Sequence, residues 1–327
     1  MNRDNTDRTS SVKTCIISPD GPGIAEVCRI LAKGLPVAVP TETVYGLAAD
    51  SRNGNAVARI YSAKGRPSFN PLIIHVPDVD AAERYAVLGD EARKLADAFW
   101  PGPLTLVLPL REDSGISSLV TAGLQTIGIR VPSHPVAQKL LRAFDAPLAA
   151  PSANPSGRVS PTTAAHVADP ETGLGGRIPA VLDGGPCAVG LESTIVGWID
   201  GRAALLRPGG VPAEEIEALI GRPLIQPELN PAAPSAPGQL SSHYAPAVPV
   251  RLNVTAPDPD ETFIAFGPGE LTLSPTRDLT EAAARLFDLL RIADARGRPI
   301  AVAPIPHHGL GAAINDRLER AAAPRQA

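Results

Sequence analysis

Apolar and polar positions follow two different periods along residues 14–221. Short apolar runs bounded by Pro or Gly are typical of buried strands, and such runs lie at 37–39, 72–74, 104–108 and 195–196. Between them, residues 55–63 and 135–144 repeat apolar positions at the spacing of one helical face. The pattern predicts an α/β domain of larger than average size.

A proline-rich segment at 222–248 follows this domain. Seven prolines lie between positions 223 and 249, which excludes a helix interior or a central strand, so we predict a linker. Residues 249–323 then carry apolar runs at 262–266 and 300–302 and helical patterns near 280–295 and 311–322. Because strands separated by helices are usually parallel, we predict a second, small β-α-β-α domain.

Composition narrows the class of protein. The net charge is −4 and aromatic residues make up only 4%, a balance that does not favour a nucleic-acid coat. The three cysteines, Cys15, Cys28 and Cys187, form no C-x-x-C pair, so neither a zinc ribbon nor a disulfide framework is expected. No apolar run reaches the ~18 residues that span a bilayer, and residues 1–13 lack the apolar core of a signal peptide. We therefore expect a cytoplasmic protein.

Hydroxyl side chains follow a predicted strand in PTETVYGL, at 40–47. In α/β sheets ligands collect at the carboxyl ends of strands, so hydroxyls such as that of Thr43 can face a cleft. The alternative is a polar turn whose threonines bond their own backbone. The spacing alone favours neither.

Two cations lie in KGRPSFNP, at 64–71. Arg66 and Asn70 each precede a proline, which favours extended backbone, and positions two apart in an extended chain project to the same side. Lys64 and Arg66 are therefore expected to aim at one place. The alternative is a helix C-terminus whose Lys and Gly satisfy the last carbonyls. This alternative does not account for the Arg-Pro and Asn-Pro pairs.

The segment PSANPSGRVSP, at 151–161, repeats this geometry. Asn154 precedes a proline, so Ser152 and Asn154 are expected to share a side. Ser160 before a proline is also typical of a helix N-cap, a role compatible with an anion at the same helix end.

A lone arginine interrupts an alternating strand in TIGIRVP, at 126–132. Ile127, Ile129 and Val131 alternate onto one face and leave Arg130 on the other, where burial is costly unless the guanidinium meets an anion. The alternative is a solvated sheet face. Arg207, after the apolar run 205–206, is a weaker case, and His75 at the end of its run can be a core histidine or a ligand.

Motifs for phosphate-binding loops, zinc peptidases and serine hydrolases are absent from the sequence. The remaining inventory is cations, hydroxyls and amides without an evident nucleophile. It favours a reaction in which the enzyme positions anions.

These segments, with PGPLTLVL, LESTIV and LRPG, occur in order from 40 to 209 and together resemble the YrdC-like family of threonylcarbamoyl-AMP synthases. The residues around 235–246 and GLG at 309–311 resemble the linker and extra domain of its two-domain form. The resemblance implies a large twisted mixed-sheet domain with a concave cleft at 14–221, a linker and lid at 222–248, and a smaller Rossmann-like α/β domain at 249–323.

The resemblance also implies an activity: L-threonine, bicarbonate and ATP give L-threonylcarbamoyladenylate and pyrophosphate, with Mg²⁺ carried by the ATP phosphates. A partner transferase then modifies an adenosine of certain tRNAs, and direct binding of tRNA is expected to be weak or absent. By position, the implied threonine residues are Thr43, His75, Arg130 and Ser193. The implied ATP residues are Arg66, Asn70, Thr126, Ser152, Ser160 and Arg207, closed over by His243 or Tyr244, and the implied catalytic tetrad is Lys64, Arg66, Ser152 and Asn154.

Two other functions remain as alternatives. A carbamoyltransferase of the hydrogenase-maturation type contains a similar domain, but it adds an acylphosphatase module and C-x-x-C pairs that this sequence lacks. A non-catalytic RNA-binding module would use a basic cleft, which the negative net charge and the few aromatic residues do not favour.

Overall fold

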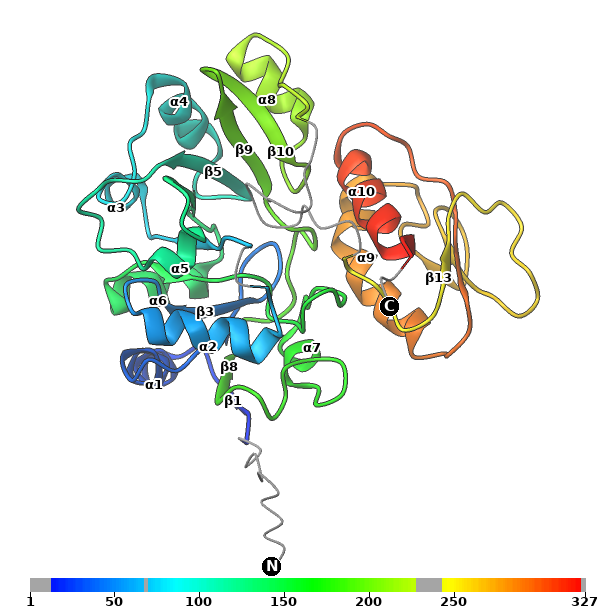
Figure 1. Cartoon of the computed structure of the whole chain (residues 1–327). Helices are drawn as coiled ribbons and strands as arrows, with labels where there is room; N and C mark the ends of the chain where they lie inside the picture. The colour runs from blue at the N-terminus through cyan, green and yellow to red at the C-terminus, as the bar shows by residue number, and fades with distance from the viewer. Residues whose placement is uncertain (1–12, 68–69, 228–242, 325–327) are drawn as a thin grey trace, which may run out of the picture.

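Two β-sheets organise the chain (Figure 1). The computed structural model describes residues 13–67, 70–227 and 243–324. In spatial order, the strands of the larger sheet are β1 (Cys15–Ile17), β8 (Ala180–Leu182), β2 (Val37–Val39), β3 (Gly46–Asp50), β7 (Leu148–Ala149), β4 (Ile73–His75), β6 (Thr126–Arg130), β5 (Leu104–Pro109), β9 (Thr194–Ile199) and β10 (Arg202–Arg207). Parallel and antiparallel pairs both occur, so the sheet is mixed, as expected.

Helices cover both faces of the larger sheet. Those of this domain are α1 (Gly21–Ala32), α2 (Gly54–Lys64), α3 (Val79–Glu83), α4 (Asp90–Phe99), α5 (Ser118–Thr121), α6 (Pro135–Phe144), α7 (Ala164–Ala168) and α8 (Ala213–Ile220). Successive strand residues point to opposite faces. Val37 and Val39 accordingly pack in one cluster with α1 and α6, whereas Ala38 between them joins the main core with α2.

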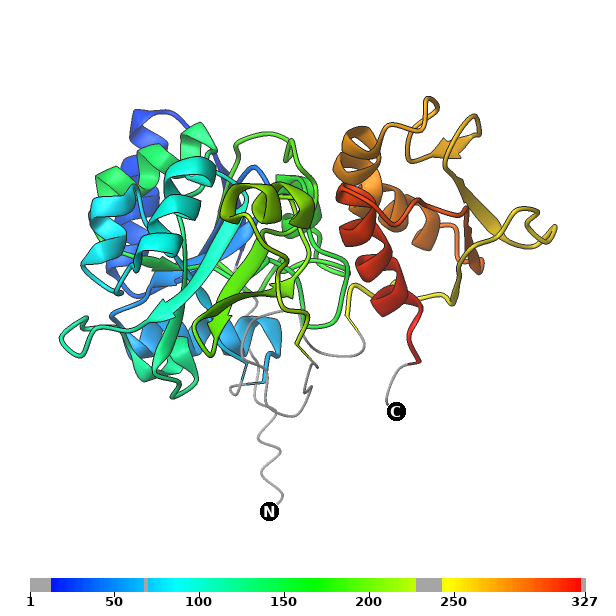
Figure 2. The ribbon, with the colours of Figure 1, turned by 90° about the horizontal axis from the view of Figure 1, so that it is seen from above.

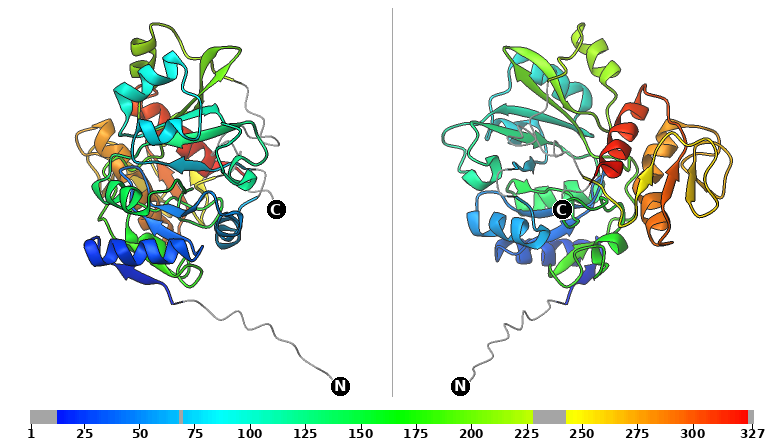
Figure 3. Two further views of the ribbon diagram at one scale, coloured as in Figure 1. Left: turned by 90° about the vertical axis from the view of Figure 1, so that its left-hand side faces the viewer. Right: turned by 45° about the vertical axis from the view of Figure 1, so that its right-hand side comes forward.

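The smaller sheet is parallel throughout. Its spatial order is β11 (Val250–Arg251), β14 (Ile300–Val302), β12 (Thr262–Ala265) and β13 (Leu271–Thr272). The helices α9 (Leu279–Asp294) and α10 (Leu310–Ala322) lie between this sheet and the larger domain (Figures 1 and 2; Figure 3, right). The expected fold class is therefore confirmed. Of the predicted linker, residues 228–242 lie outside the described residues.

The two domains touch through α9 and the residues that lead into α10 on one side, and through loops and the start of α8 on the other. Arg291 of α9 donates from Nη2 to the Val159 carbonyl oxygen at 2.6 Å, and the Gly309 amide before α10 donates to Glu214 Oε1 at 3.0 Å. Gly190 fits against α9 without a side chain. A Cβ there would lie 2.5 Å from the Ala283 carbonyl oxygen, and φ is +72°.

Gly190→Ala is therefore expected to lower the free energy of unfolding by about 2 kcal/mol more than Gly201→Ala does, because it adds overpacking at the domain contact. Gly201 is the matched control, since its φ is +73° and its Cβ would meet no atom within 4 Å. Urea unfolding of both variants measures the difference. Equal losses would mean that the two domains are not in close contact at Gly190.

Candidate active site

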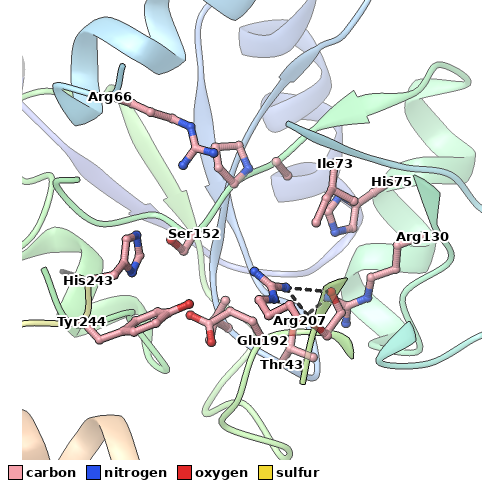
Figure 4. Close-up of a pocket in the computed structure, with 14 residues that line it drawn as sticks. Thr43, Arg66, Ile73, His75, Arg130, Ser152, Glu192, Arg207, His243 and Tyr244 are labelled. Atoms are coloured by element: carbon pink, nitrogen blue, oxygen red, sulfur yellow. Dashed lines mark hydrogen bonds between the residues drawn. The ribbon is translucent and has the colours of Figure 1, made fainter. Parts of the chain in front are cut away.

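The candidate site lies on the side of the larger sheet that faces away from its main core. On β6, Ile127 and Ile129 pack in that core, so Arg130 points to the opposite side. β4 pairs with β6 in a register that sets His75 beside Arg130. Strand ends and loops complete a pocket whose lining residues are Thr43, Val44, Arg66, Ile73, His75, Arg130, Ala150, Pro151, Ser152, Glu192, Ser193, Arg207, His243 and Tyr244 (Figure 4).

One corner of the pocket is built around Arg130. Its Nη2 donates to Glu42 Oε1 at 2.6 Å, its Nη1 to Thr43 Oγ1 at 2.8 Å, and its Nε to the Gly102 carbonyl at 3.1 Å. Burial alone would raise the pKa of Glu42, but the Arg130 guanidinium outweighs it and holds that pKa below its ordinary value. The anion that a buried Arg130 requires is thus supplied by the chain itself.

His75 and Ser193 flank this corner. Burial, and then the charge of Arg130, lower the pKa of His75 to about 3, so its imidazole is neutral at ordinary pH. Its Nδ1 is buried and has no hydrogen-bond partner. Ser193 Oγ lies 2.7 Å from Thr105 Oγ1 and also accepts from Arg207 Nη2 at 3.2 Å. Thr43, His75, Arg130 and Ser193, which the sequence analysis grouped, therefore line one pocket.

The two cations of 64–71 converge, but not through extended chain. Lys64 is the last residue of α2, and Gly65 caps the helix at φ 60°, so the prediction of an extended backbone at Lys64 was wrong and the helix-end alternative is correct. Arg66 lines the pocket and donates from Nη2 to the Pro71 carbonyl at 3.0 Å. Burial and the charge of Arg66 lower the pKa of Lys64, and burial lowers that of Arg66 to about 10.

Lys64 joins the two predicted segments through main-chain oxygens. Its Nζ donates to the carbonyls of Ser152 at 2.5 Å and of Asn154 at 2.7 Å. Ser152 lines the pocket, whereas Asn154 is buried behind it and donates from Nδ2 to the carbonyls of Pro155 and Arg158. The tetrad is therefore brought together around the Lys64 ammonium.

Ser160 does not cap a helix. Helix α7 begins at Ala164 with Thr163 as its N-cap, so the predicted capping role of Ser160 was wrong. The Ser160 hydroxyl makes a tertiary hydrogen bond in place of a helix cap: its Oγ donates to the buried carboxylate oxygen Oε1 of Glu192 at 2.6 Å. Ser160 therefore lies one contact away from the pocket.

Arg207, Glu192 and the end of the linker form the other side of the pocket. Arg207 donates from Nε and Nη2 to the Ser193 carbonyl, at 3.1 and 2.8 Å. His243 and Tyr244 project into the pocket from one edge, opposite His75 and Arg130 (Figure 4). Burial lowers the pKa of His243 to about 3 and raises that of Tyr244 to about 12.

Lys64, Asn154 and Ser160 are not among the residues that line the pocket, and neither are Asn70 and Thr126. Thr126 begins β6, four residues before Arg130, and Asn70 is buried behind Arg66, whose Nε donates to the Asn70 carbonyl at 3.4 Å. Conversely, the sequence analysis assigned no role to Glu42 or Glu192, although both lie within quoted motifs. In each motif, a single carboxylate among hydroxyl and apolar residues was the sequence feature that could have indicated a buried charge.

Buried polar atoms without a partner gather at this site. Among the described residues, the atoms of this kind that belong to the site or its immediate surroundings are Glu42 Oε2, Asn70 Oδ1, His75 Nδ1, Asn154 Oδ1 and His243 Nδ1. A buried polar atom normally has a partner, so such a gathering indicates a place where a ligand completes the hydrogen bonds. Lys64 and Arg207 are buried, and Arg66 is half-buried beside them. Because Glu42 already pairs with Arg130, these three cations are the ones that make the expected ligand an anion.

The described part of the chain contains no cluster of three or more His, Cys, Asp or Glu side chains arranged to hold a metal ion. Within the same residues, no helix combines the length and the apolar character required to cross a membrane.

Comparisons with known proteins match both parts of the chain. The Sua5/YciO/YrdC family, described as "Telomere recombination", matches residues 29–209, and the domain described as "Threonylcarbamoyl-AMP synthase, C-terminal domain" matches residues 211–323. The threonylcarbamoyl-AMP synthase of Bacillus subtilis is 41% identical, over 94% of this chain and 95% of the relative. The threonylcarbamoyl-AMP synthase of Pyrococcus abyssi is also 41% identical, over 89% of this chain and 91% of the relative.

Solved structures agree with these relatives. The crystal structure of P. abyssi Sua5 complexed with L-threonine superposes with a TM-score of 0.86 at 38% identity, covering 94% of this chain and 98% of that one. A full-length HypF in a phosphate- and nucleotide-bound form has a TM-score of 0.51 at 19% identity, and only 29% of it is covered. The latter is a likeness of fold alone.

The Glu42–Arg130 pair generates a pH-dependent prediction. Because the pKa of folded Glu42 is depressed, its stabilisation is complete above the unfolded value, about 4.3, and is lost as the pH falls through the folded pKa. Glu42→Gln is expected to lower the free energy of unfolding at pH 7 by about 3 kcal/mol, since Arg130 loses its buried charge partner.

Urea unfolding of the wild type and Glu42→Gln at pH 7 and at about pH 3.5 measures this difference, which is expected to shrink at the lower pH. Glu270→Gln is the control, because Glu270 pairs with Arg296 at the surface, where such pairs contribute little. A deficit of the same size at both pH values would show that the charge of Glu42 is not what stabilises Arg130.

Proposed function

The chain belongs to the Sua5/YciO/YrdC family in its two-domain form and is a nucleotidyltransferase-type enzyme, and on this premise we propose that it joins L-threonine, bicarbonate and ATP into L-threonylcarbamoyladenylate with release of pyrophosphate. The observation that carries the proposal is the gathering of four cations, three of them buried, and several unpartnered polar atoms around one pocket. Burying like charges together is costly, and a polyphosphate relieves that cost.

The ATP end of the pocket is assigned to the cations near Ser152. Burial, and to a lesser extent the charge of Arg207, lower the pKa of Arg66, and an incoming triphosphate would reverse this effect. His243 and Tyr244 lie at the same edge and would pack over the nucleotide. Asn70, Thr126 and Ser160, which do not line the pocket, are assigned to this half by the family resemblance.

The threonine end is assigned to the corner around Arg130. A guanidinium suits the carboxylate of an amino acid, and Thr43, Ser193 and the neutral His75 supply hydroxyl and imidazole groups for its amine and hydroxyl. The P. abyssi relative was solved in complex with L-threonine, which supports threonine as the amino acid.

The proposed chemistry needs no side-chain nucleophile. The threonine amine and bicarbonate form a carbamate with loss of water, and a carbamate oxygen attacks the α-phosphorus of ATP while pyrophosphate leaves. The enzyme's part is to align the reactants and to neutralise charge, through Lys64, Arg66 and Arg130. Water would hydrolyse both the carbamate and the mixed anhydride, so a closed pocket beneath the linker serves the reaction.

Mg²⁺ is proposed to arrive on the phosphate oxygens of ATP. The two carboxylates of the pocket are already bonded to arginines, Glu42 to Arg130 and Glu192 to Arg317. This donor set fits an ion held by the substrate phosphates, whose charge it would help to neutralise. The product would then pass to a transferase that modifies an adenosine of tRNA, without strong binding of tRNA by this chain.

Mass spectrometry of the product formed from threonine, bicarbonate and MgATP tests the proposal directly. The expected product is L-threonylcarbamoyladenylate, with threonine-dependent release of pyrophosphate in the absence of RNA. Tight RNA binding without that release would favour the RNA-binding alternative instead. Formation of a carbamoyladenylate without threonine would favour the hydrogenase-maturation type.

Removing either cation of 64–71 is expected to abolish synthesis while the fold persists. Lys64→Met and Arg66→Ala should each lower kcat by about 100-fold or more. Arg66→Ala removes a cation that lines the pocket, and Lys64→Met removes the cation that holds the Ser152 segment in the pocket wall. Pyrophosphate release gives the rate, and circular dichroism checks the fold. Lys139→Met, at an exposed position of α6, is the matched control. Full turnover in a folded Lys64 or Arg66 variant would remove that residue from the mechanism.

A further inference from the structure

One arginine of the C-terminal domain is built into the wall of the nucleotide pocket. Arg317 lies on α10 and its side chain is fully buried. It occupies a position of the buried stripe of that helix, where Ile314, Leu318 and Ala321 are apolar. Burying the charge of an arginine at such a position costs free energy unless the charge is paired, so the partners of Arg317 indicate its role.

The partners of Arg317 belong mostly to the other domain. Its Nε donates to Glu192 Oε2 at 2.8 Å, and its Nη2 donates to the Pro208 carbonyl at 2.9 Å. Its guanidinium carbon lies 5.2 Å from the centre of the Tyr244 ring, within reach of a cation–π contact. Arg317 therefore joins three segments that line the pocket or directly adjoin its lining.

Asp316 by itself does not balance the charge of Arg317. It accepts from Arg317 Nη1 at 2.5 Å, but it also accepts from Arg320 Nε at 3.0 Å, so a second cation shares its charge. Burial would lower the pKa of Arg317, whereas Tyr244, Glu192 and Asp316 together raise it. The charge of Arg317 is therefore retained.

Glu192 is the group that makes this charge necessary. It lines the pocket that is assigned to ATP, and a bare carboxylate there would repel a polyphosphate. Ser160 and Arg317 occupy its two oxygens, Oε1 and Oε2. Burial would raise the pKa of Glu192, but Arg317 and then Arg207 hold it low, so the carboxylate stays ionised and needs a compensating cation.

We propose that Arg317 is a positioning residue through which the C-terminal domain completes the nucleotide pocket: it neutralises Glu192, whose carboxylate would otherwise repel the phosphates of ATP. The identity of that ligand rests on the proposed function. The inference gives the second domain a specific part in nucleotide binding, separate from the threonine corner at Thr43 and Arg130, which Arg317 does not contact.

A double-mutant cycle tests this proposal. The variants are Arg317→Met, Glu192→Gln and the two together, and the ligand is Mg²⁺ with α,β-methylene-ATP, whose α–β bridge cannot be cleaved. Arg317→Met should raise Kd for the analogue by about tenfold or more, and adding Glu192→Gln should return it to within about threefold of the wild type. In turnover assays of Arg317→Met, KM for ATP should rise while KM for threonine stays within about threefold.

Arg285→Met is the matched control, since Arg285 lies on α9 of the same domain and its ion-pair partner among the described residues is Glu281 of the same helix. A purely structural loss would raise Kd for the analogue and KM for both substrates and would not be rescued by Glu192→Gln, and that result would overturn the proposal. A wild-type Kd in Arg317→Met would overturn it as well.

Two further outcomes keep the test decisive. If Arg317→Met does not fold, the double variant is compared with the wild type instead, because it buries no uncompensated carboxylate at position 192. A folded double variant that binds the analogue tenfold or more weakly than the wild type does would overturn the proposal. If the wild type binds the analogue but releases no pyrophosphate with threonine, the proposed function fails while the cycle still measures the role of Arg317. A wild type that does not bind the analogue overturns both.

Discussion

Charge removed from water is the constraint on which this structure depends. Lys64, Arg130, Arg207 and Arg317 are buried, and Arg66 is half-buried, within and around one pocket. Each can remain there only if carbonyl oxygens, carboxylates or an incoming anion replace the lost hydration. The chain itself compensates part of this charge through the carboxylates of Glu42 and Glu192 and part through main-chain carbonyl oxygens.

The mixed sheet makes this concentration of charge possible. Its alternation sends Ile127 and Ile129 into the main core and Arg130 to the other side, so one strand supplies both core and site. Loops after β2 and β7 and the ends of β4, β6 and β10 then deliver polar side chains from segments far apart in the chain. The C-terminal domain closes the arrangement, because Arg317 meets Glu192 and Pro208 across the domain contact.

Much of the fold was predictable because it depends on local periodicity. The runs at 37–39 and 104–108 became β2 and β5, and the helical stretch 135–144 became α6 with the same bounds. Residues grouped by motif, such as Thr43, His75 and Arg130, do line one pocket. Local rules failed at Lys64, where a helix end replaces extended chain, and at Ser160, where a tertiary contact with Glu192 replaces a helix cap.

By itself, the sequence determined the alternation of strands and helices, the two-domain order and several of the segments that line the pocket. These depend on neighbours along the chain, whose spacing is visible in the text of the sequence. Only the tertiary structure decided which charged groups meet. Glu42 pairs with Arg130, and Arg317 pairs with a carboxylate of the other domain. Lys64 donates to the carbonyls of Ser152 and Asn154. Pairing of buried charges depends on distances across the fold, and residues 125 positions apart, such as Glu192 and Arg317, carry no mark of their contact in the sequence.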